Sequence, residues 1–428
     1  MVTAFAPART WAQTGQKSAA WSAIDCATFK LENIPADSGV ECGYVSAPLR
    51  HEQPEGPKIQ LGTVIIPSKD ANRQPDPLFL AQGGPGGSTI GTFASIIISS
   101  PQYNPAPNRD LVLWDQRGTL FSKPALLCPE VTEAELRAAL VDGQSTDSGD
   151  DLGPYKGCGA RLAKEAGDLS AFNSAENADD IEDVRAALGY DQINYWGVSY
   201  GTELGQFVLR RQPDHLRAVI LDAVVPLTYN LFTEPAFAKQ RIATKYFEAC
   251  AADARCNAAF PNLAERYRAL YDRLNANPVT LTVSPLEPEG GILNNKTYQV
   301  KLSGSGLESA LYQALYGPVH DLMPLIVDRA DKGDFTYVAD FLLPAGLFDT
   351  SMAEGMYFAV ACADRADTNP DRVDYSAINP RLAEAERDGA KAEVALCKEL
   401  GIQLLPRDQL EPVQSDKPVL LLSGDYDP

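Results

Sequence analysis

Short runs of apolar residues, each bounded by turn-forming residues, recur along the chain and predict β-strands. They are found at residues 58–66, 77–81, 110–114, 192–196, 217–221 and 418–422. The last five runs are short and almost wholly apolar, which is typical of parallel strands that are covered on both faces. Because helical patterns such as residues 175–188 lie between them, the sequence predicts an α/β fold with a mostly parallel, doubly wound sheet.

The pattern changes to a mainly helical one between residues 229 and 406. Helical periodicity is found there at residues 236–251, 263–275, 306–316 and 381–399. A Pro/Gly-rich stretch, 278–296, interrupts it and predicts a hairpin or a loop. We interpret 229–406 as a cap domain inserted between two core segments, 26–228 and 407–428.

The first 25 residues do not share these patterns. They show Ala-x-Ala-like spacing without a long apolar segment before it, so we interpret residues 1–25 as an N-terminal extension or the remnant of a signal peptide.

Composition narrows the possible partners. The 428 residues contain 37 Lys and Arg against 57 Asp and Glu, a net charge of −20. Nucleic-acid-binding proteins cluster Lys and Arg, so no nucleic-acid partner is expected. No run approaches the roughly 20 apolar residues of a membrane span. The acidic segment 142–151 lacks the ligand spacing of an EF-hand and is interpreted as a solvated loop.

The eight cysteines predict a compartment. They contain no Cys-x-x-Cys pattern, so no metal site and no cofactor are expected. They fall into four sequential couples, which we predict to be disulfides: 26 with 42, 128 with 158, 250 with 256, and 362 with 397. Disulfides persist mainly in oxidising compartments, which favours a secreted or periplasmic protein. The alternative is eight buried thiols in a cytosolic protein.

The strongest chemical signal is Gly197-Val198-Ser199-Tyr200-Gly201, which directly follows the predicted strand 192–196 and precedes a helical run. A sharp strand-to-helix turn can hold a serine exposed in strained dihedrals, and it needs small residues two positions before and after that serine. Gly197 and Gly201 meet this need. We therefore predict the α/β-hydrolase fold with Ser199 as the catalytic nucleophile.

A tetrahedral oxyanion requires two backbone N–H donors, one of them from the residue after the nucleophile. Tyr200 occupies that position. The Gly-rich segment 82–88 follows the predicted strand 77–81, and we predict Gly84 as the second donor. This segment lacks the Gly-Lys-Ser/Thr end of a P-loop and the G-x-G-x-x-G spacing of a dinucleotide site, so phosphate binding is not expected.

The motif Asp115-Gln116-Arg117-Gly118 ends another predicted strand. We expect a structural role, in which Asp115 and Arg117 pair and brace the loops beside Ser199.

The acid and the base of a triad should follow later in the chain. The predicted strand 418–422 runs into Gly424-Asp425-Tyr426-Asp427, and we predict Asp427 as the acid, with Asp425 as the alternative. The three histidines, His51, His215 and His320, all precede this acid and are interpreted as surface or core residues. Without a base the serine is poorly deprotonated, so we expect the chain as given to be weakly active or inactive.

These motifs and their order resemble the secreted, tripeptidyl-aminopeptidase-like branch of the proline iminopeptidase family, serine peptidases of the α/β-hydrolase fold. The residues that carry the resemblance are Gly83-Gly84-Pro85-Gly86-Gly87, Asp115-Gln116-Arg117-Gly118, Gly197-Val198-Ser199-Tyr200-Gly201-Thr202 with 221–225, and the segments 355–364 and 424–428. The resemblance implies Ser199 as nucleophile, Asp427 as acid, and release of short peptides or proline-containing residues from peptide N-termini. It also implies a helix, a strand and the triad histidine after Asp427, so the chain is expected to lack its last several tens of residues.

One departure from the family pattern concerns specificity. Gln82 stands where the cytosolic iminopeptidases carry a histidine, which fits the secreted branch and weakens strict proline specificity. An aminopeptidase must also hold a substrate ammonium group, and Asp364 and Glu203 are the favoured carboxylates, with Glu354 and Glu234 as further candidates.

Three functions follow as hypotheses. The first is an aminopeptidase. The second is a carboxylesterase or lactone hydrolase with the same triad, because the fold does not determine the acyl substrate. The third is a binding protein that kept the pocket and lost the base. A peptide or a small ester is the expected partner.

Overall fold

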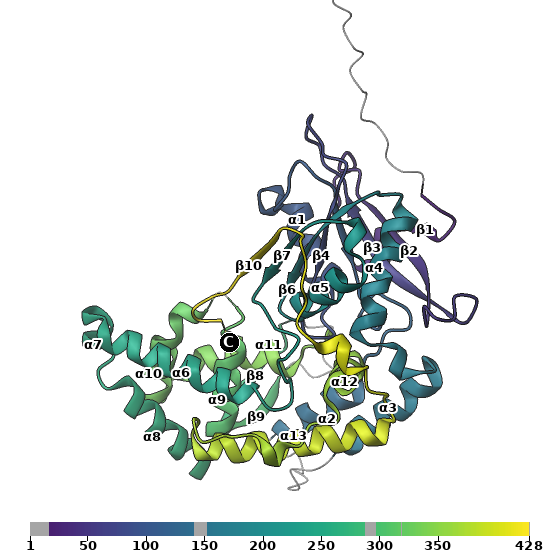
Figure 1. Ribbon diagram of the computed structural model, residues 1–428. Coiled ribbons are helices and arrows are strands. Elements are labelled where there is room, and N and C mark those ends of the chain that lie inside the picture. The colour runs from purple at the N-terminus through teal and green to yellow at the C-terminus, as the bar shows by residue number, and fades with distance from the viewer. Residues whose placement is uncertain (1–16, 141–151, 287–296, 318, 428) are drawn as a thin grey trace, which may run out of the picture. The chain divides into compact units, whose positions relative to one another are not determined.

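The computed structural model describes residues 17–140, 152–286, 297–317 and 319–427 and divides into two compact units (Figure 1). The sheet unit comprises the chain up to Leu126, Ala171–Thr228 and Pro406–Leu422. The helical unit comprises Leu127–Ser170, Tyr229–Leu405 and the residues from Ser423. The sequence predicted that residues 127–170 belong to the core, but they group with the helical unit. The residues from Ser423, which include the predicted acid Asp427, also group with the helical unit.

The sheet unit contains an eight-stranded sheet in the order β1-β2-β3-β5-β4-β6-β7-β10. The first three, β1 (Trp21–Ile24), β2 (Glu41–Pro48) and β3 (Lys58–Ile66), are antiparallel neighbours, and β3 also pairs antiparallel with β5 (Leu111–Trp114). The other pairs are parallel and involve β4 (Leu78–Ala81), β6 (Ile193–Val198), β7 (Leu216–Asp222) and β10 (Val419–Leu422). The predicted α/β-hydrolase fold and its six strands are confirmed.

The two faces of this sheet carry different helices. Leu78, Leu80, Leu111 and Leu113 form one hydrophobic cluster with residues of α1 (Ser95–Ser99) and the turn before it. On the other face lie α4 (Ser174–Leu188), which packs on β2 and α5, and α5 (Tyr200–Arg211), which packs on β6 and β7. Strand side chains alternate between the faces, so each central strand is buried on both sides.

Strand β10 departs from the expectation that every parallel strand is covered. It is the outermost strand of the order, and Val419, Leu420, Leu421 and Leu422 are 38% to 62% exposed. An edge strand has only one neighbour in the sheet, and an apolar edge of this kind is a site for further pairing.

The helical unit has its own apolar core, which combines α8 (Leu263–Ala276), α9 (Gly304–Ala314) and α10 (Met323–Asp331) with a β-hairpin. The hairpin pairs β8 (Val279–Val283) with β9 (Tyr298–Leu302), as the Pro/Gly-rich stretch predicted. The other long helices are α2 (Pro129–Ala139), α3 (Gly153–Glu165), α6 (Pro235–Ala252), α12 (Glu354–Arg365) and α13 (Pro380–Leu400).

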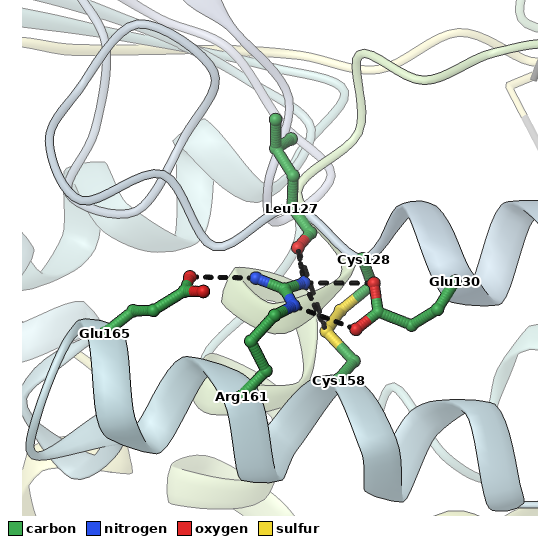
Figure 2. The surroundings of a disulfide bond; sticks show 6 residues. All are labelled: Leu127, Cys128, Glu130, Cys158, Arg161 and Glu165. Atoms are coloured by element: carbon green, nitrogen blue, oxygen red, sulfur yellow. Dashed lines mark hydrogen bonds and ion pairs between the residues drawn. A yellow bond between two sulfur atoms is a disulfide. The ribbon is translucent and has the colours of Figure 1, made fainter.

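All four predicted disulfides are present: Cys26–Cys42, Cys128–Cys158, Cys250–Cys256 and Cys362–Cys397. Figure 2 shows the second, which joins the start of α2 to α3. Beside it Arg161 donates to the Leu127 carbonyl and pairs with Glu130 and Glu165 (Figure 2). None of the described helices combines the length and apolar composition needed to cross a bilayer. The acidic segment 142–151 lies outside the described residues.

Candidate active site

Ser199 lies in a strained turn between β6 and α5. Its backbone has φ 55° and ψ −125°, a region that L-residues rarely adopt, and its N–H donates to the Asp222 carbonyl at 3.0 Å. A Cβ on Gly197 would lie 2.0 Å from the Gly201 carbonyl oxygen, and one on Gly201 would lie 2.4 Å from that of Ala81. Only glycine fits at both positions, which is the geometry of the predicted nucleophile turn.

The Gly-rich loop after β4 lies directly against Ser199. A Cβ on Gly83 would lie 2.8 Å from Ser199 Oγ and 3.0 Å from the Tyr200 nitrogen. The Gly83 N–H donates to Gln82 Oε1, whereas the exposed Gly84 N–H donates to no acceptor among the described residues. This arrangement is compatible with Gly84 and Tyr200 as oxyanion donors, which stays a prediction.

Asp115 holds the far end of this loop. Its carboxylate accepts from the Ser88 hydroxyl at 2.9 Å, from the Ile90 N–H at 3.0 Å and from the Phe121 N–H at 2.9 Å. Burial raises the pKa of Asp115 to about 6, and these donors act against that rise. The carboxylate is therefore held by neutral donors rather than by a cation.

Arg117 is engaged elsewhere, so the predicted pairing of Asp115 with Arg117 is wrong. The fully buried guanidinium of Arg117 bonds both oxygens of Asp180 at 2.6 and 2.7 Å and donates to the carbonyls of Leu49 and Ala171. Both residues follow the last residue of β5, outside the regular strand, and their side chains have separate partners. Each still braces a separate loop.

His51 extends the Arg117–Asp180 pair toward the surface. Its Nδ1 lies 2.5 Å from Glu176 and its Nε2 lies 3.0 Å from Asp183. Burial disfavours the imidazolium, but the hydrogen bonds to Asp183 and Glu176 outweigh burial and raise the pKa of His51 to about 9. His51, Asp180 and Asp183 present donor atoms within 4.8 Å of one another, as a metal would require. Because Asp180 is occupied by Arg117 and His51 is protonated at neutral pH, we assign an ion-pair network.

Neither His51 nor His215 is placed to act as the base. Both ring nitrogens of His51 face carboxylates, and His215 Nδ1 bonds the Asp191 carbonyl at 3.0 Å on the surface of the sheet unit. The side chain of His320 lies outside the described residues. A proton acceptor for Ser199 is therefore not found among the described histidine side chains.

The candidate acid belongs to the helical unit, whereas Ser199 belongs to the sheet unit. Asp425 is exposed and forms an ion pair with Lys245 of α6. The Asp427 backbone carbonyl accepts from Arg241 of the same helix, and its N–H donates to Gly424. Asp427 as the acid, with Asp425 as the alternative, stays a prediction.

The predicted ammonium-binding carboxylates are also divided between the units. Glu203 is buried in the first turn of α5, and Asp364 is buried in α12. In the helical unit, burial also raises the pKa of Glu354 to about 6 and that of Glu393 on α13 to about 8. Glu393 was not among the predicted site residues, although its neighbours one helical turn away, Ala390, Leu396 and Cys397, are apolar and mark a buried side of α13.

Two further side chains near Ser199 are fully buried. Gln116 Nε2 donates to the Gln82 carbonyl at 2.7 Å, and Asn177 Nδ2 of α4 donates to Gln116 Oε1 at 3.0 Å. The Asp115-Gln116-Arg117-Gly118 motif drew attention to Gln116. No pattern in the sequence identified Asn177.

Comparison with known proteins agrees with this geometry. A general profile of the α/β-hydrolase fold matches residues 76–280. The chain is similar to a tripeptidyl aminopeptidase of Streptomyces coelicolor, with 31% identity over 45% of this chain and 36% of the relative. It is also similar to the serine protease Hip1 of Mycobacterium bovis, with 29% identity over 56% of this chain and 48% of the relative. A carboxylesterase B of Mycobacterium tuberculosis is 30% identical over 80% of this chain and 65% of the relative.

The chain thus spans from about a third to two thirds of the length of these curated relatives. Their names include peptidases and an esterase, which agree in hydrolysis and differ in the acyl substrate.

Proposed function

We propose that this α/β-hydrolase-fold protein is an extracytoplasmic serine aminopeptidase that releases short peptides or proline-containing residues from peptide N-termini. The observation that carries the proposal is the contact of the Gly83 backbone with Ser199 at a strained turn, because such a turn and loop form the acylation site of serine hydrolases. Relatives named as a tripeptidyl aminopeptidase and a serine protease support the peptide substrate.

The proposed reaction proceeds through an acyl-enzyme. Ser199 Oγ attacks the scissile carbonyl, its proton passes to a histidine base, and the oxyanion accepts from the N–H groups of Gly84 and Tyr200. The histidine then protonates the leaving amine, and water releases the acyl group by the reverse sequence. Asp427 would orient the histidine, and Asp364 or Glu203 would bind the substrate ammonium.

Peptide p-nitroanilides with free and acetylated N-termini test the proposal. We expect turnover, at most weak in this chain, of the free peptides only, and its loss in Ser199→Ala. Equal rates for free and blocked peptides would contradict an aminopeptidase, since no ammonium would then be recognised.

The second candidate is a carboxylesterase or lactone hydrolase with the same catalytic residues. The relative named carboxylesterase B covers the largest share of this chain among the three compared above, which favours this candidate. Rapid hydrolysis of p-nitrophenyl esters together with inert peptides would establish it.

The third candidate is a binding protein without a base. Fluorophosphonate labelling distinguishes it, because the reagent modifies only an activated serine. Given the partners of His51 and His215, we expect slow labelling of Ser199 in this chain, and rapid labelling would show that a base is present.

The proposed location outside the cytoplasm rests on the four disulfides. Intact mass under reducing and non-reducing conditions should differ by two hydrogens per bond, or about eight mass units in all. Equal masses would contradict this location.

A further inference from the structure

The two halves of the predicted oxyanion hole are both connected to one helix, α4. One half is the loop that contains Gly84, and the other is the turn that contains Tyr200. Ser174 and Asn177 are three residues apart on α4 and therefore lie on the same side of it. Both side chains are fully buried in the sheet unit.

The first connection is a chain of two amides. The Gln82 carbonyl can only accept a hydrogen bond, so the side chain of Gln116 must present its NH₂ group there, at 2.7 Å. Gln116 Oε1 must then accept, and it does so from Asn177 Nδ2 at 3.0 Å. The orientation of both amides is therefore fixed by the Gln82 carbonyl.

One atom at the Asn177 end of this amide chain destabilises the folded state. Asn177 Oδ1 is buried and has no hydrogen-bond partner among the described residues. An unsatisfied buried oxygen costs about 1–3 kcal/mol, and such features concentrate where function requires them. An apolar residue would avoid this cost but could not hold Gln116.

The second connection reaches Tyr200. The hydroxyl groups of Ser174 and Tyr200 lie 2.9 Å apart in the buried interior. Tyr200 is the first residue of α5, and its backbone nitrogen lies beside the Gly83 backbone. Helix α4 thus contacts the side chain of one predicted donor residue directly and reaches the loop of the other through Gln116.

We propose that α4 sets the separation of the two oxyanion donors, with Asn177, Gln116 and Ser174 as positioning residues. This inference rests on the proposed function, in which the N–H groups of Gly84 and Tyr200 bind the oxyanion. A donor that is misplaced by about 1 Å lowers the rate by about 100-fold, although substrate binding in the ground state changes little. The positioning residues therefore act on kcat rather than on KM.

The test compares three variants with one matched control in the full chain. Gln116→Met and Asn177→Leu break the amide chain, and Ser174→Ala removes the hydroxyl contact. The control is Asn194→Ala, which removes another buried amide that donates to Asp76 at the opposite end of β6 from Ser199. The control lowers stability without touching the loop or α4.

Hydrogen exchange of the peptide 82–92 is the first readout and needs no activity. We expect faster exchange of this peptide in Gln116→Met and Asn177→Leu, and unchanged exchange in Asn194→Ala. Unchanged exchange in both amide variants would overturn the proposal.

Catalysis and adduct formation are the second readout. We expect kcat to fall by about 10- to 100-fold in the amide variants, with KM changed by less than about 2-fold. Binding of a peptide boronate, which forms a tetrahedral adduct with Ser199, should weaken by the same factor as kcat. A loss of kcat no larger than that of Asn194→Ala would show that the amides stabilise the fold without setting the donors, and would overturn the proposal.

The failure of the proposed function would look different. If the unaltered protein hydrolysed neither peptides nor esters, the proposed function would fail, while exchange of 82–92 and boronate binding would still decide whether α4 positions the donors.

Discussion

The sheet unit and the helical unit are each stabilised internally, by different kinds of cross-link. In the sheet unit, the buried side chains of Asp115, Gln116 and Arg117 form hydrogen bonds that join loops far apart in the chain. One disulfide, Cys26–Cys42, lies near the N-terminal end of this unit. In the helical unit, the other three disulfides join neighbouring helices. The sheet unit, which contains Ser199, relies on directional polar contacts that fix positions. The helical unit relies more on covalent links, which mainly limit unfolding.

The largest expected effect comes from removing the central cation of the sheet unit. Arg117→Met leaves Asp180 buried without its partner and should lower the free energy of unfolding by about 3–5 kcal/mol. Chemical denaturation followed by hydrogen exchange of sheet-unit peptides measures this loss.

A double variant is the control for that prediction. Arg117→Met combined with Asp180→Leu removes both charges and should recover most of the stability, because no unpaired charge stays buried. If the double variant were as unstable as Arg117→Met alone, the carbonyl contacts of Arg117 would matter more than its charge.

The next effect concerns the helical unit. Replacing Cys128 and Cys158 by serine opens a loop with a sequence separation of 30 residues and should cost about 3 kcal/mol. Exchange should increase in α2 and α3 first, and the peptide 82–92 should keep its protection. Equal losses in the two units would show that they unfold together, which would contradict the comparison. The same change at Cys26 and Cys42 should affect the sheet unit instead.

A smaller effect is the pH dependence due to Glu393. Its pKa is raised to about 8 by burial, so between pH ~4.3 and pH 8 the unfolded chain loses a proton that the folded chain keeps. Stability should therefore fall as pH rises through this window. Glu393→Gln should remove that fall and be more stable above pH 8 by on the order of 1 kcal/mol, since the side chain is only partly buried by accessible surface. The exposed Glu384 on the same helix is the matched control, and Glu384→Gln should leave the pH profile unchanged.

The smallest effect is expected at an exposed ion pair. Arg137 and Glu133 are four residues apart on α2, and their side chains are 60% and 39% exposed. Arg137→Ala should change the free energy of unfolding by less than about 0.5 kcal/mol, and a double-mutant cycle with Glu133→Ala measures the pair alone. A coupling above about 1 kcal/mol would show that surface charges contribute to the helical unit beside its disulfides.

Much of the fold could be predicted because its signals are local. The strand 58–66 matches β3 at both ends, and the helix 263–275 differs from α8 by one residue. The strands β1 and β2 were not predicted, because polar and small residues interrupt the apolar residues of both. Both depend on antiparallel pairing, β1 with β2 and β2 also with β3, rather than on their own pattern.

The candidate site also has some features that the sequence predicts and others that it does not. Ser199 and its two glycines are predicted by steric needs within five residues, and the disulfide couples by the sequential order of the cysteines. The pairing of Asp115 was predicted wrongly because no local pattern identifies Ser88 as its partner. The burial of Glu393 was not predicted, because the burial of a side chain on a helix depends on which element packs against that helix.

The sequence by itself therefore determined the α/β-hydrolase fold and the strained turn at Ser199, since periodicity and close steric contact act over a few residues. The cysteine couples followed from the even number and sequential order of the cysteines. Only the tertiary structure decided that Arg117 binds Asp180 and that Gln116 joins Gln82 to Asn177. The hydrogen bonds of Gln116 span 34 and 61 residues. Such contacts depend on strand order and on helix position, which a local pattern of residues does not contain.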